Sequence, residues 1–280
     1  MTAAGGQAPP AGRAFDRIRK ELAELLKLAG PVIVARLGIM MMGVTDAIVV
    51  GRFSATQLGY HALGWAPTAV VMTVALGLLS GVQVMTSRAI GEGRLAETGA
   101  VLRRGLSYAL VMGLAATAIL LAGGSWFLHA IGLEKDLADG SSAVLLVFAL
   151  SMPATTLSVA CSSWLEAHGR PTPAMTLMWI ANGVNLAIDL VLVPGGFGLA
   201  PMGAIGGGWA TFGARAFLAV ASLIYIFRMK EARAWGVFDK PPRDRPAEAE
   251  QRRVGYGSGA SNLFEVASFF GVLAPAGTPP

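Results

Sequence analysis

Charged residues and cysteine are both scarce in this sequence of 280 residues. Only 14% of the residues are charged and 54% are hydrophobic, whereas soluble domains carry about 25% charged residues. Because so few charges cannot cover a surface that faces water, the composition excludes an ordinary soluble domain. The single cysteine, Cys161, excludes an internal disulfide and a cysteine-based metal cluster. We interpret it as a small apolar residue that fills space in a helix.

Charge is absent altogether from four long runs, at 53–87, 105–133, 140–165 and 190–214. Each run exceeds the roughly 20 residues that cross a bilayer as a helix. Two further apolar spans, 28–51 and 171–193, contain few charges. With a mean hydropathy of +0.58, these runs predict an all-α polytopic membrane protein. We expect its helices at about 28–52, 58–87, 100–128, 140–167, 172–194 and 203–227.

The Lys and Arg residues are distributed unevenly between the two sides that these helices define. Eighteen of the 22 fall in the N-terminal segment and in the connections after the second, fourth and sixth helices. Arg52 and Lys135 lie on the opposite side, and Arg36 and Arg215 lie within helices. The positive-inside rule therefore predicts a cytoplasmic N-terminus in the inner membrane and a return to the cytoplasm after helix six. The same rule explains the basic charge better than nucleic-acid binding does.

The pattern divides the chain into four parts. Residues 1–27 lack the basic start and apolar core of a signal peptide and form a cytoplasmic N-terminal segment. Residues 28–227 form a six-helix transmembrane lobe. Residues 228–252, rich in charge and proline, read as a cytoplasmic linker. Residues 253–280 begin a seventh helix that gives way to a tail, GVLAPAGTPP, without a helical pattern.

Three acidic residues lie inside the predicted spans: Asp46, Asp189 and Glu265. Asn182, Asn185 and Asp189 are spaced three and four apart, so they share one helix face. A polar stripe on an apolar helix faces a cavity or another helix rather than lipid. Such a stripe forms a structural staple, a protonatable site on a pathway, or an oxygen-rich nest for Na⁺. If the site binds Na⁺, we expect the ion to lie at Asp46 and Asp189.

Other candidate motifs have plain explanations. The segment GGFGLAPMGAIGGG lacks the Lys-Ser/Thr sequel of a phosphate loop, and its Gly203 and Gly207 have the spacing of closely packed helices. We expect the Arg36 side chain to reach the cytoplasmic surface. Prolines that can kink helices are Pro31, Pro67, Pro153 and Pro194. The histidines are scattered near helix ends, at His61, His129 and His168, and do not predict a metal site. The sequence contains no recognisable nucleophile–base pair or cofactor motif, so we do not expect an enzyme.

Several segments resemble a known family of transporters. LAGPVIVARLGIMMMGVTDAIVVGR is similar to the first helix of MATE (multidrug and toxic compound extrusion) transporters of the NorM-like branch. In the same order, SSWLEAHGRPTPAM resembles the junction of helices four and five, and NGVNLAIDLVLV resembles helix five. GAIGGGWATFGAR resembles helix six, and GYGSGASNLFEVASFF resembles helix seven. The resemblance runs from about residue 22 to about residue 270.

The resemblance implies half of a twelve-helix antiporter that exports drugs or other organic cations as H⁺ or Na⁺ enters, without a cofactor. By position, Asp46, Asn185 and Asp189 match the cation site of the family's N-terminal lobe. Thr211 matches a hydroxyl of helix six in the same network. Glu265 matches an acid of helix seven that belongs to a cation or substrate site in the second lobe.

The sequence departs from the family because helices eight to twelve have no counterpart in it. We expect a frameshifted, truncated or fragmentary product that lacks its C-lobe. An obligate dimer of half-transporters is the alternative. Two other functions stay open: a lipid-linked sugar flippase of the same superfamily, and a membrane fragment that transports nothing. The flippase would need more basic residues inside the membrane than Arg36 and Arg215.

Overall fold

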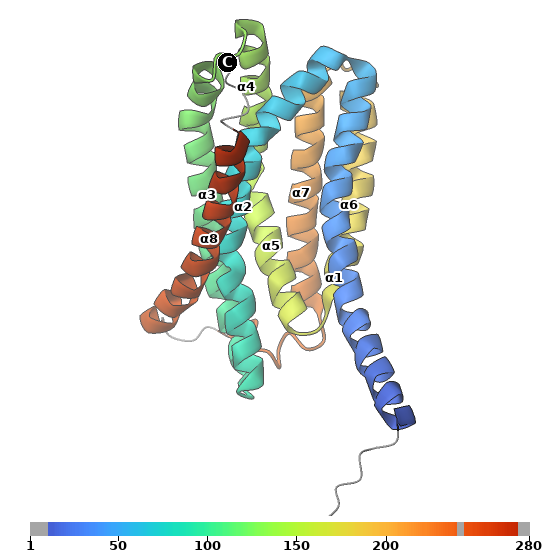
Figure 1. Cartoon of the computed structure of the whole chain (residues 1–280), viewed down its shortest axis with the longest axis vertical. Helices are drawn as coiled ribbons and strands as arrows, with labels where there is room; N and C mark the ends of the chain where they lie inside the picture. The colour runs from blue at the N-terminus through green and yellow to red at the C-terminus, as the bar shows by residue number, and fades with distance from the viewer. Residues whose placement is uncertain (1–10, 240–243, 274–280) are drawn as a thin grey trace, which may run out of the picture.

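The structure is a computed structural model, and it shows a bundle of long helices (Figure 1). It describes residues 11–239 and 244–273, without the side chains of residues 11–18, 20, 21, 23–25, 28 and 265–273. Its elements are α1 (Ala11–Phe53), α2 (Ala55–Gly91), the short 3₁₀ helix η1 (Leu95–Glu97), α3 (Thr98–Ala130), α4 (Lys135–Leu150), α5 (Met152–Ala167), α6 (Pro171–Leu192), α7 (Gly203–Arg228) and α8 (Arg245–Leu273).

The predicted spans are present in the described part of the chain. Five segments are long and apolar enough to cross a membrane: Ala29–Phe53, Ala55–Gly91, Leu95–Ala130, Pro171–Leu192 and Gly203–Arg228. Helices α4 and α5 make a sixth span when they are taken together as one bent pair. Large apolar side chains such as Met40, Ile119 and Trp126 are more than 60% exposed. They suit a surface that faces lipid rather than water. The all-α membrane fold is therefore confirmed.

The predicted continuous helix at 140–167 is wrong, because the span breaks between α4 and α5 with a bend of 42°. Pro153 explains the break, since proline has no N–H to donate to the carbonyl of Ala149 one turn earlier. The hydroxyl of Thr117, on α3, donates to that carbonyl instead, at 2.7 Å. The break leaves Ser151 buried at the join, and its hydroxyl donates to the carbonyl of Phe148 at 2.7 Å.

The helix expected from residue 253 also starts earlier than the sequence predicts. We expected a linker over 228–252 and a helix from residue 253, but α8 already begins at Arg245. The Asp244 carboxylate accepts the backbone N–H of Ala247 at 3.1 Å and so caps the first turn. Pro246 suits the same turn, whose N–H groups have no partner within the helix. Charge and proline thus belong to the start of this helix as well as to the linker.

Helix α2 is the centre of the bundle and crosses it diagonally (Figure 1). On one side of α2, helix α6 packs against both α1 and α7. On the other side, α3 packs against α4 and α5, while α8 packs along α2. The turns after α2, α5 and α7 all lie at one end of the bundle, the lower end in Figure 1. We call this end the basic side, after its residues Arg94, Arg170 and Arg228.

Cys161 is free and fully buried in the hydrophobic core formed by α2, α3, α5 and α7, as the sequence predicted. The predicted close approach of α7 is confirmed as well. A side chain added at Gly207 would lie 3.0 Å from Val50 of α1 and 3.3 Å from the ring of His61 on α2. Glycine at this position therefore brings three helices together.

Candidate cation site between helices α1, α6 and α7

The Asp46 side chain lies in the middle of the apolar part of α1 and is only 3% exposed. One carboxylate oxygen accepts the side-chain N–H of Asn185, on α6, at 2.8 Å. The other accepts the hydroxyl of Thr211, on α7, at 2.5 Å. Hydrogen bonds of this length to a carboxylate are of the strong, charge-assisted kind. Two neighbouring helices therefore stabilise a charge that apolar surroundings alone would not tolerate.

The polar stripe of α6 faces α1, as its spacing predicted. Nearest the basic side, Asn182 donates to the carbonyl of Gly38 at 3.0 Å, which joins the two helices directly. One turn further along, Asn185 is fully buried and reaches Asp46. Asp189 follows after another turn and is fully buried too. The stripe thus forms a single polar seam within an apolar bundle.

The seam holds oxygens that lack hydrogen-bond donors. Within the described residues, neither carboxylate oxygen of Asp189 has a hydrogen-bond partner, and the side-chain oxygen of Asn185 has none either. The Asp189 carboxyl group lies close enough to that of Asp46 for the two to interact electrostatically. Buried acceptors without donors are rare and costly in native proteins. Oxygen atoms of this kind bind a proton or a hard cation such as Na⁺.

Arg215 of α7 supplies a buried positive charge next to this seam. One terminal nitrogen of its guanidinium donates to the Ser151 hydroxyl at 2.8 Å, at the break between α4 and α5. The guanidinium carbon also lies 5.0 Å from the centre of the Trp65 ring, in reach of a cation–π interaction. Arg215 interacts electrostatically with Asp46. The sequence showed Arg215 as a charge inside a helix but gave it no partner.

His61 of α2 approaches the same carboxylate from a third direction. Its Nε2 atom lies 3.9 Å from Asp46 Oδ2, too far for a hydrogen bond. The ring is 7% exposed and packs edge-on against Phe148, with 5.2 Å between ring centres. In the described part of the chain, Nδ1 has no hydrogen-bond partner. In the sequence, His61 is one of three histidines scattered near helix ends. The missed signal is approximate symmetry about the α1–α2 turn: Asp46 lies eight residues before Ser54 and His61 lies seven residues after it, so the two helices can bring them side by side.

Comparison with known proteins identifies the family. The MatE family model matches residues 31–191, which is more than half of the chain. The chain belongs to the MatE family. It is 59% identical over 255 residues to a probable multidrug resistance protein NorM of Caulobacter vibrioides, covering 91% of this chain and 54% of that one. It is 33% identical to the multidrug resistance protein PmpM of Pseudomonas aeruginosa, covering 92% and 54%.

Solved structures agree with this assignment at the level of the fold. A MATE crystal structure in a bent conformation aligns with a TM-score of 0.78 at 19% identity, over 88% of this chain and 55% of that one. The eukaryotic MATE transporter AtDTX14 aligns with a TM-score of 0.82 at 17% identity, over 93% and 57%. The chain spans about half the length of the curated relatives and solved structures that it matches.

The MatE chain therefore brings four of the five predicted site residues together: Asp46, Asn185, Asp189 and Thr211. The fifth, Glu265, lies on α8, and its side chain is outside the described residues. Arg36 is exposed, and its charge interacts with that of Glu166. Among the described residues, no group of three or more His, Cys, Asp and Glu side chains is arranged to hold a metal ion. A Na⁺ site here would have to use amide and hydroxyl oxygens as well.

Proposed function

We propose that this chain forms the N-terminal lobe of a cation-coupled antiporter that exports drugs or other organic cations, with H⁺ or Na⁺ as the coupling ion. The family assignment and the names of the relatives support transport. The arrangement around Asp46 and Asp189 supports ion coupling. The acceptor oxygens of Asp189, buried beside a second carboxylate and without a donor among the described residues, are the observation that carries the proposal.

The charges of the buried cluster lead to a stoichiometry. Asp46 and Asp189 contribute two negative charges when both are ionised, and Arg215 contributes one positive charge. With His61 neutral, one negative charge stays uncompensated in a region of low dielectric constant. One proton or one Na⁺ would neutralise it. The lobe is therefore expected to bind a single monovalent cation in this cluster.

Coupling follows if ion binding changes the packing of the three helices. With the ion bound, the cluster is neutral and favours tight packing of α6 against α1. Without the ion, the carboxylates of Asp46 and Asp189 repel each other and favour a looser arrangement of the two helices. Drug and ion would then exchange because each prefers a different arrangement. The drug path itself would need a second six-helix unit, since the solved relatives contain nearly as much chain again. The unit is a C-terminal lobe or another copy of this chain.

The charges of the loops predict the orientation of the chain in the membrane and hence the side from which the ion enters. The basic side carries most of the Lys and Arg residues, so the positive-inside rule assigns it to the cytoplasm of an inner-membrane protein. The turns at Ser54 and Gly132 then face outward. Asp189, near the end of α6 away from the basic side, would receive its ion from outside.

Ion binding by the chain itself tests the proposal. The chain is purified in lipid nanodiscs in a weakly buffered solution, and Na⁺ uptake and proton release are measured by calorimetry and with a pH-sensitive dye. We expect one saturable cation per chain, and we expect its loss in Asp46→Asn and in Asp189→Asn. The matched control is Asp244→Asn, an exposed aspartate outside the spans. Undiminished ion binding in both buried variants would refute the assignment.

Transport is tested in the same variants. The chain is co-expressed with the C-terminal half of the Caulobacter vibrioides relative in a drug-sensitive bacterium, and drug accumulation is measured. Wild type is expected to lower accumulation, whereas Asp46→Asn is expected to abolish the effect although it still inserts into the membrane. An Asp46→Asn variant that exports as well as wild type would contradict the role of this carboxylate.

A further inference from the structure

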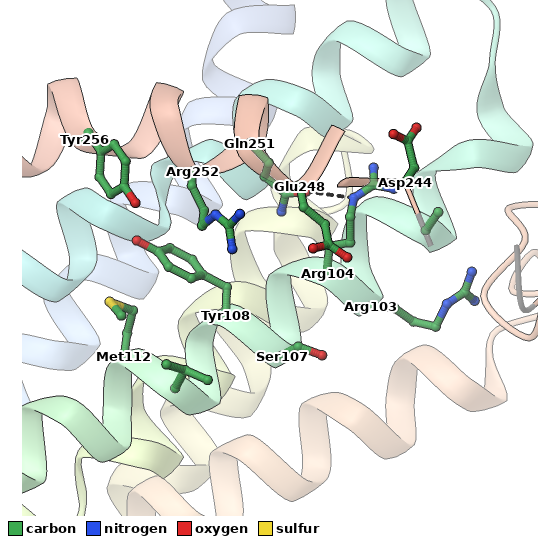
Figure 2. Close-up of a pocket in the computed structure, with 12 residues that line it drawn as sticks. Arg103, Arg104, Ser107, Tyr108, Met112, Asp244, Glu248, Gln251, Arg252 and Tyr256 are labelled. Carbon is green, nitrogen blue, oxygen red and sulfur yellow. Dashed lines mark hydrogen bonds between the residues drawn. The ribbon is translucent and has the colours of Figure 1, made fainter. Parts of the chain in front are cut away.

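A cavity opens between α3 and α8 at the basic side, away from the buried carboxylates (Figure 2). Its volume is about 740 Å³. Both helices pack on α2, and the cavity lies where they diverge from each other. Its polar lining consists of Arg103, Arg104, Ser107 and Tyr108 from α3, Gln251, Arg252, Glu248 and Tyr256 from α8, and Asp244. The volume suits the polar part of a lipid or a molecule of similar size.

Positive charge predominates in the lining. Three guanidinium groups face two carboxylates, those of Asp244 and Glu248. The Asp244 carboxylate is engaged at the start of α8, where it accepts the N–H of Ala247. The cavity therefore has a net positive charge, which attracts an anion rather than a cation. The positive charge of the cavity also argues against a role in binding the organic cations of the proposed transport.

The arginines are held in place and still have donors to offer. Arg103 donates through one terminal nitrogen to the carbonyls of Gly236 and Val237, at 3.1 and 2.8 Å. Its other terminal nitrogen is buried, and Figure 2 shows the side chain pointing away from Arg104 and Arg252, so Arg103 adds positive charge beside the cavity rather than a donor to it. Among the described residues, Arg104 donates through its Nε atom to the side-chain oxygen of Gln251, at 3.3 Å. Guanidinium groups oriented in this way match the oxygens of a phosphate in pairs.

Arg252 and the two tyrosines complete a ring of donors. Figure 2 shows Arg252 reaching from α8 towards Tyr108 on α3, and the hydroxyl ends of Tyr108 and Tyr256 pointing toward one another. The arginine and Tyr256 both interact electrostatically with Tyr108. The hydroxyl groups add donors for the oxygens of a headgroup. Donors from two different helices therefore converge on the space between them.

One wall of the cavity is apolar and continues into the lipid-facing surface of α3. Val111 and Met112 line the cavity at its end nearer the bundle centre. Next to these residues on α3, Leu110 is 43% exposed, and Leu114, beyond them, is 54% exposed. Charge at the membrane edge followed by an apolar strip fits an amphiphile that stands parallel to the helices. A free anion such as inorganic phosphate would use only the charged end.

We propose that this cavity binds the phosphate headgroup of an anionic phospholipid, with the acyl chains lying along Val111 and Leu114. The position supports this ligand, because basic pockets between membrane helices on the cytoplasmic side recognise such headgroups. The bound lipid would bridge α3 and α8 and so restrain α8 against the rest of the bundle. The site is independent of the carboxylate cluster and of the proposed transport.

Native mass spectrometry of the delipidated chain tests the site with two probes, dioleoyl phosphatidylglycerol and its zwitterionic counterpart dioleoyl phosphatidylcholine. We expect the anionic lipid to bind at least about tenfold more tightly, because both lipids carry the phosphate and the apolar chains, but the choline of phosphatidylcholine adds a positive charge that the arginines repel. Arg252→Gln should remove this preference. The matched control is Arg253→Gln, which changes the same charge one residue away and outside the cavity.

Three outcomes would overturn the assignment. They are equal affinity for the two lipids, equal losses in Arg252→Gln and Arg253→Gln, and binding of inorganic phosphate as tight as that of the lipid. If Arg252→Gln does not fold, Ser107→Phe fills the cavity from an exposed position without a change in charge. It should abolish the preference as well, and a preference that survives in a folded Ser107→Phe variant would refute the site.

Discussion

The two buried carboxyl groups of the cluster should respond to substitution with opposite changes in stability. Asp189 is fully buried, and its oxygens have no donor within the described structure. A buried polar group without a hydrogen bond costs about 1–3 kcal/mol. Leucine has the branched shape of aspartate without the polar atoms. In the absence of bound cation, Asp189→Leu should therefore raise the free energy of unfolding by about 1–3 kcal/mol.

Asp46 should behave in the other way because it accepts two hydrogen bonds. Asp46→Leu leaves the Asn185 amide and the Thr211 hydroxyl buried without their acceptor. Each abandoned donor costs about 1–3 kcal/mol, so the free energy of unfolding should fall by about 2–6 kcal/mol. The difference in sign comes chiefly from hydrogen bonding, since both side chains are buried carboxylic acids, and the interaction of Asp46 with Arg215 acts in the same direction.

Equilibrium unfolding in mixed detergent micelles measures both changes, with helix content followed by circular dichroism. A second arm adds Na⁺ at about 100 times its dissociation constant, which should stabilise wild type by about 2.7 kcal/mol through mass action. The same addition should leave Asp189→Leu unchanged, because the site has lost its oxygens. If Asp189→Leu is less stable than wild type without cation, its carboxyl group has a favourable partner, and the reasoning is wrong.

Two further predictions concern the histidine after α5 and glycines within α2 and α3. Burial chiefly lowers the pKa of His168, which stacks on Trp235 with 4.0 Å between ring centres. Protonation then favours the unfolded chain, so stability should be full well above about pH 6.5 and fall as the pH drops below it, a slope that His168→Gln removes in thermal melts. Gly64→Ala places a methyl group 2.8 Å from the Ser141 carbonyl oxygen and should cost about 1–3 kcal/mol. Gly123→Ala, with nothing within 4 Å, should be neutral or stabilising by chemical denaturation.

The membrane spans were predictable because each depends on a local property of the sequence. A run without charge cannot face water, and its length fixes whether it crosses a bilayer. The break at Ser151 depends in addition on a contact with another helix. Pro153 alone permits either a kink or a continued helix, and the Thr117 hydroxyl of another helix satisfies the carbonyl that proline leaves free. Sequence periodicity does not reveal such a contact between α3 and α4.

The site was predictable as far as it lies on one helix. Asn185 and Asp189 share a face by spacing alone, Asp46 stands out as an acid inside an apolar span, and the resemblance to a family added Thr211. His61 and Arg215 were not assigned to the site, because their proximity to Asp46 depends on how α2 and α7 pack around α1. For His61, its similar distance from the turn at Ser54, seven residues against eight for Asp46, would have indicated the contact. Arg215 had no such local signal.

The unequal environments of the two carboxyl groups explain why an apolar helix keeps an acid at Asp46. Hydrogen bonds from Asn185 and Thr211 hold the Asp46 carboxyl group in place without a bound cation. Asp189 lacks such donors in the described structure, so under the proposed ion binding the cation would supply its partners. A site with two fully satisfied acids would have no need of a cation, and one with two unsatisfied acids would not hold its shape without one. The division between one anchored and one unsatisfied acid therefore suits reversible binding, and it places the larger effect of the ion on α6 rather than on α1.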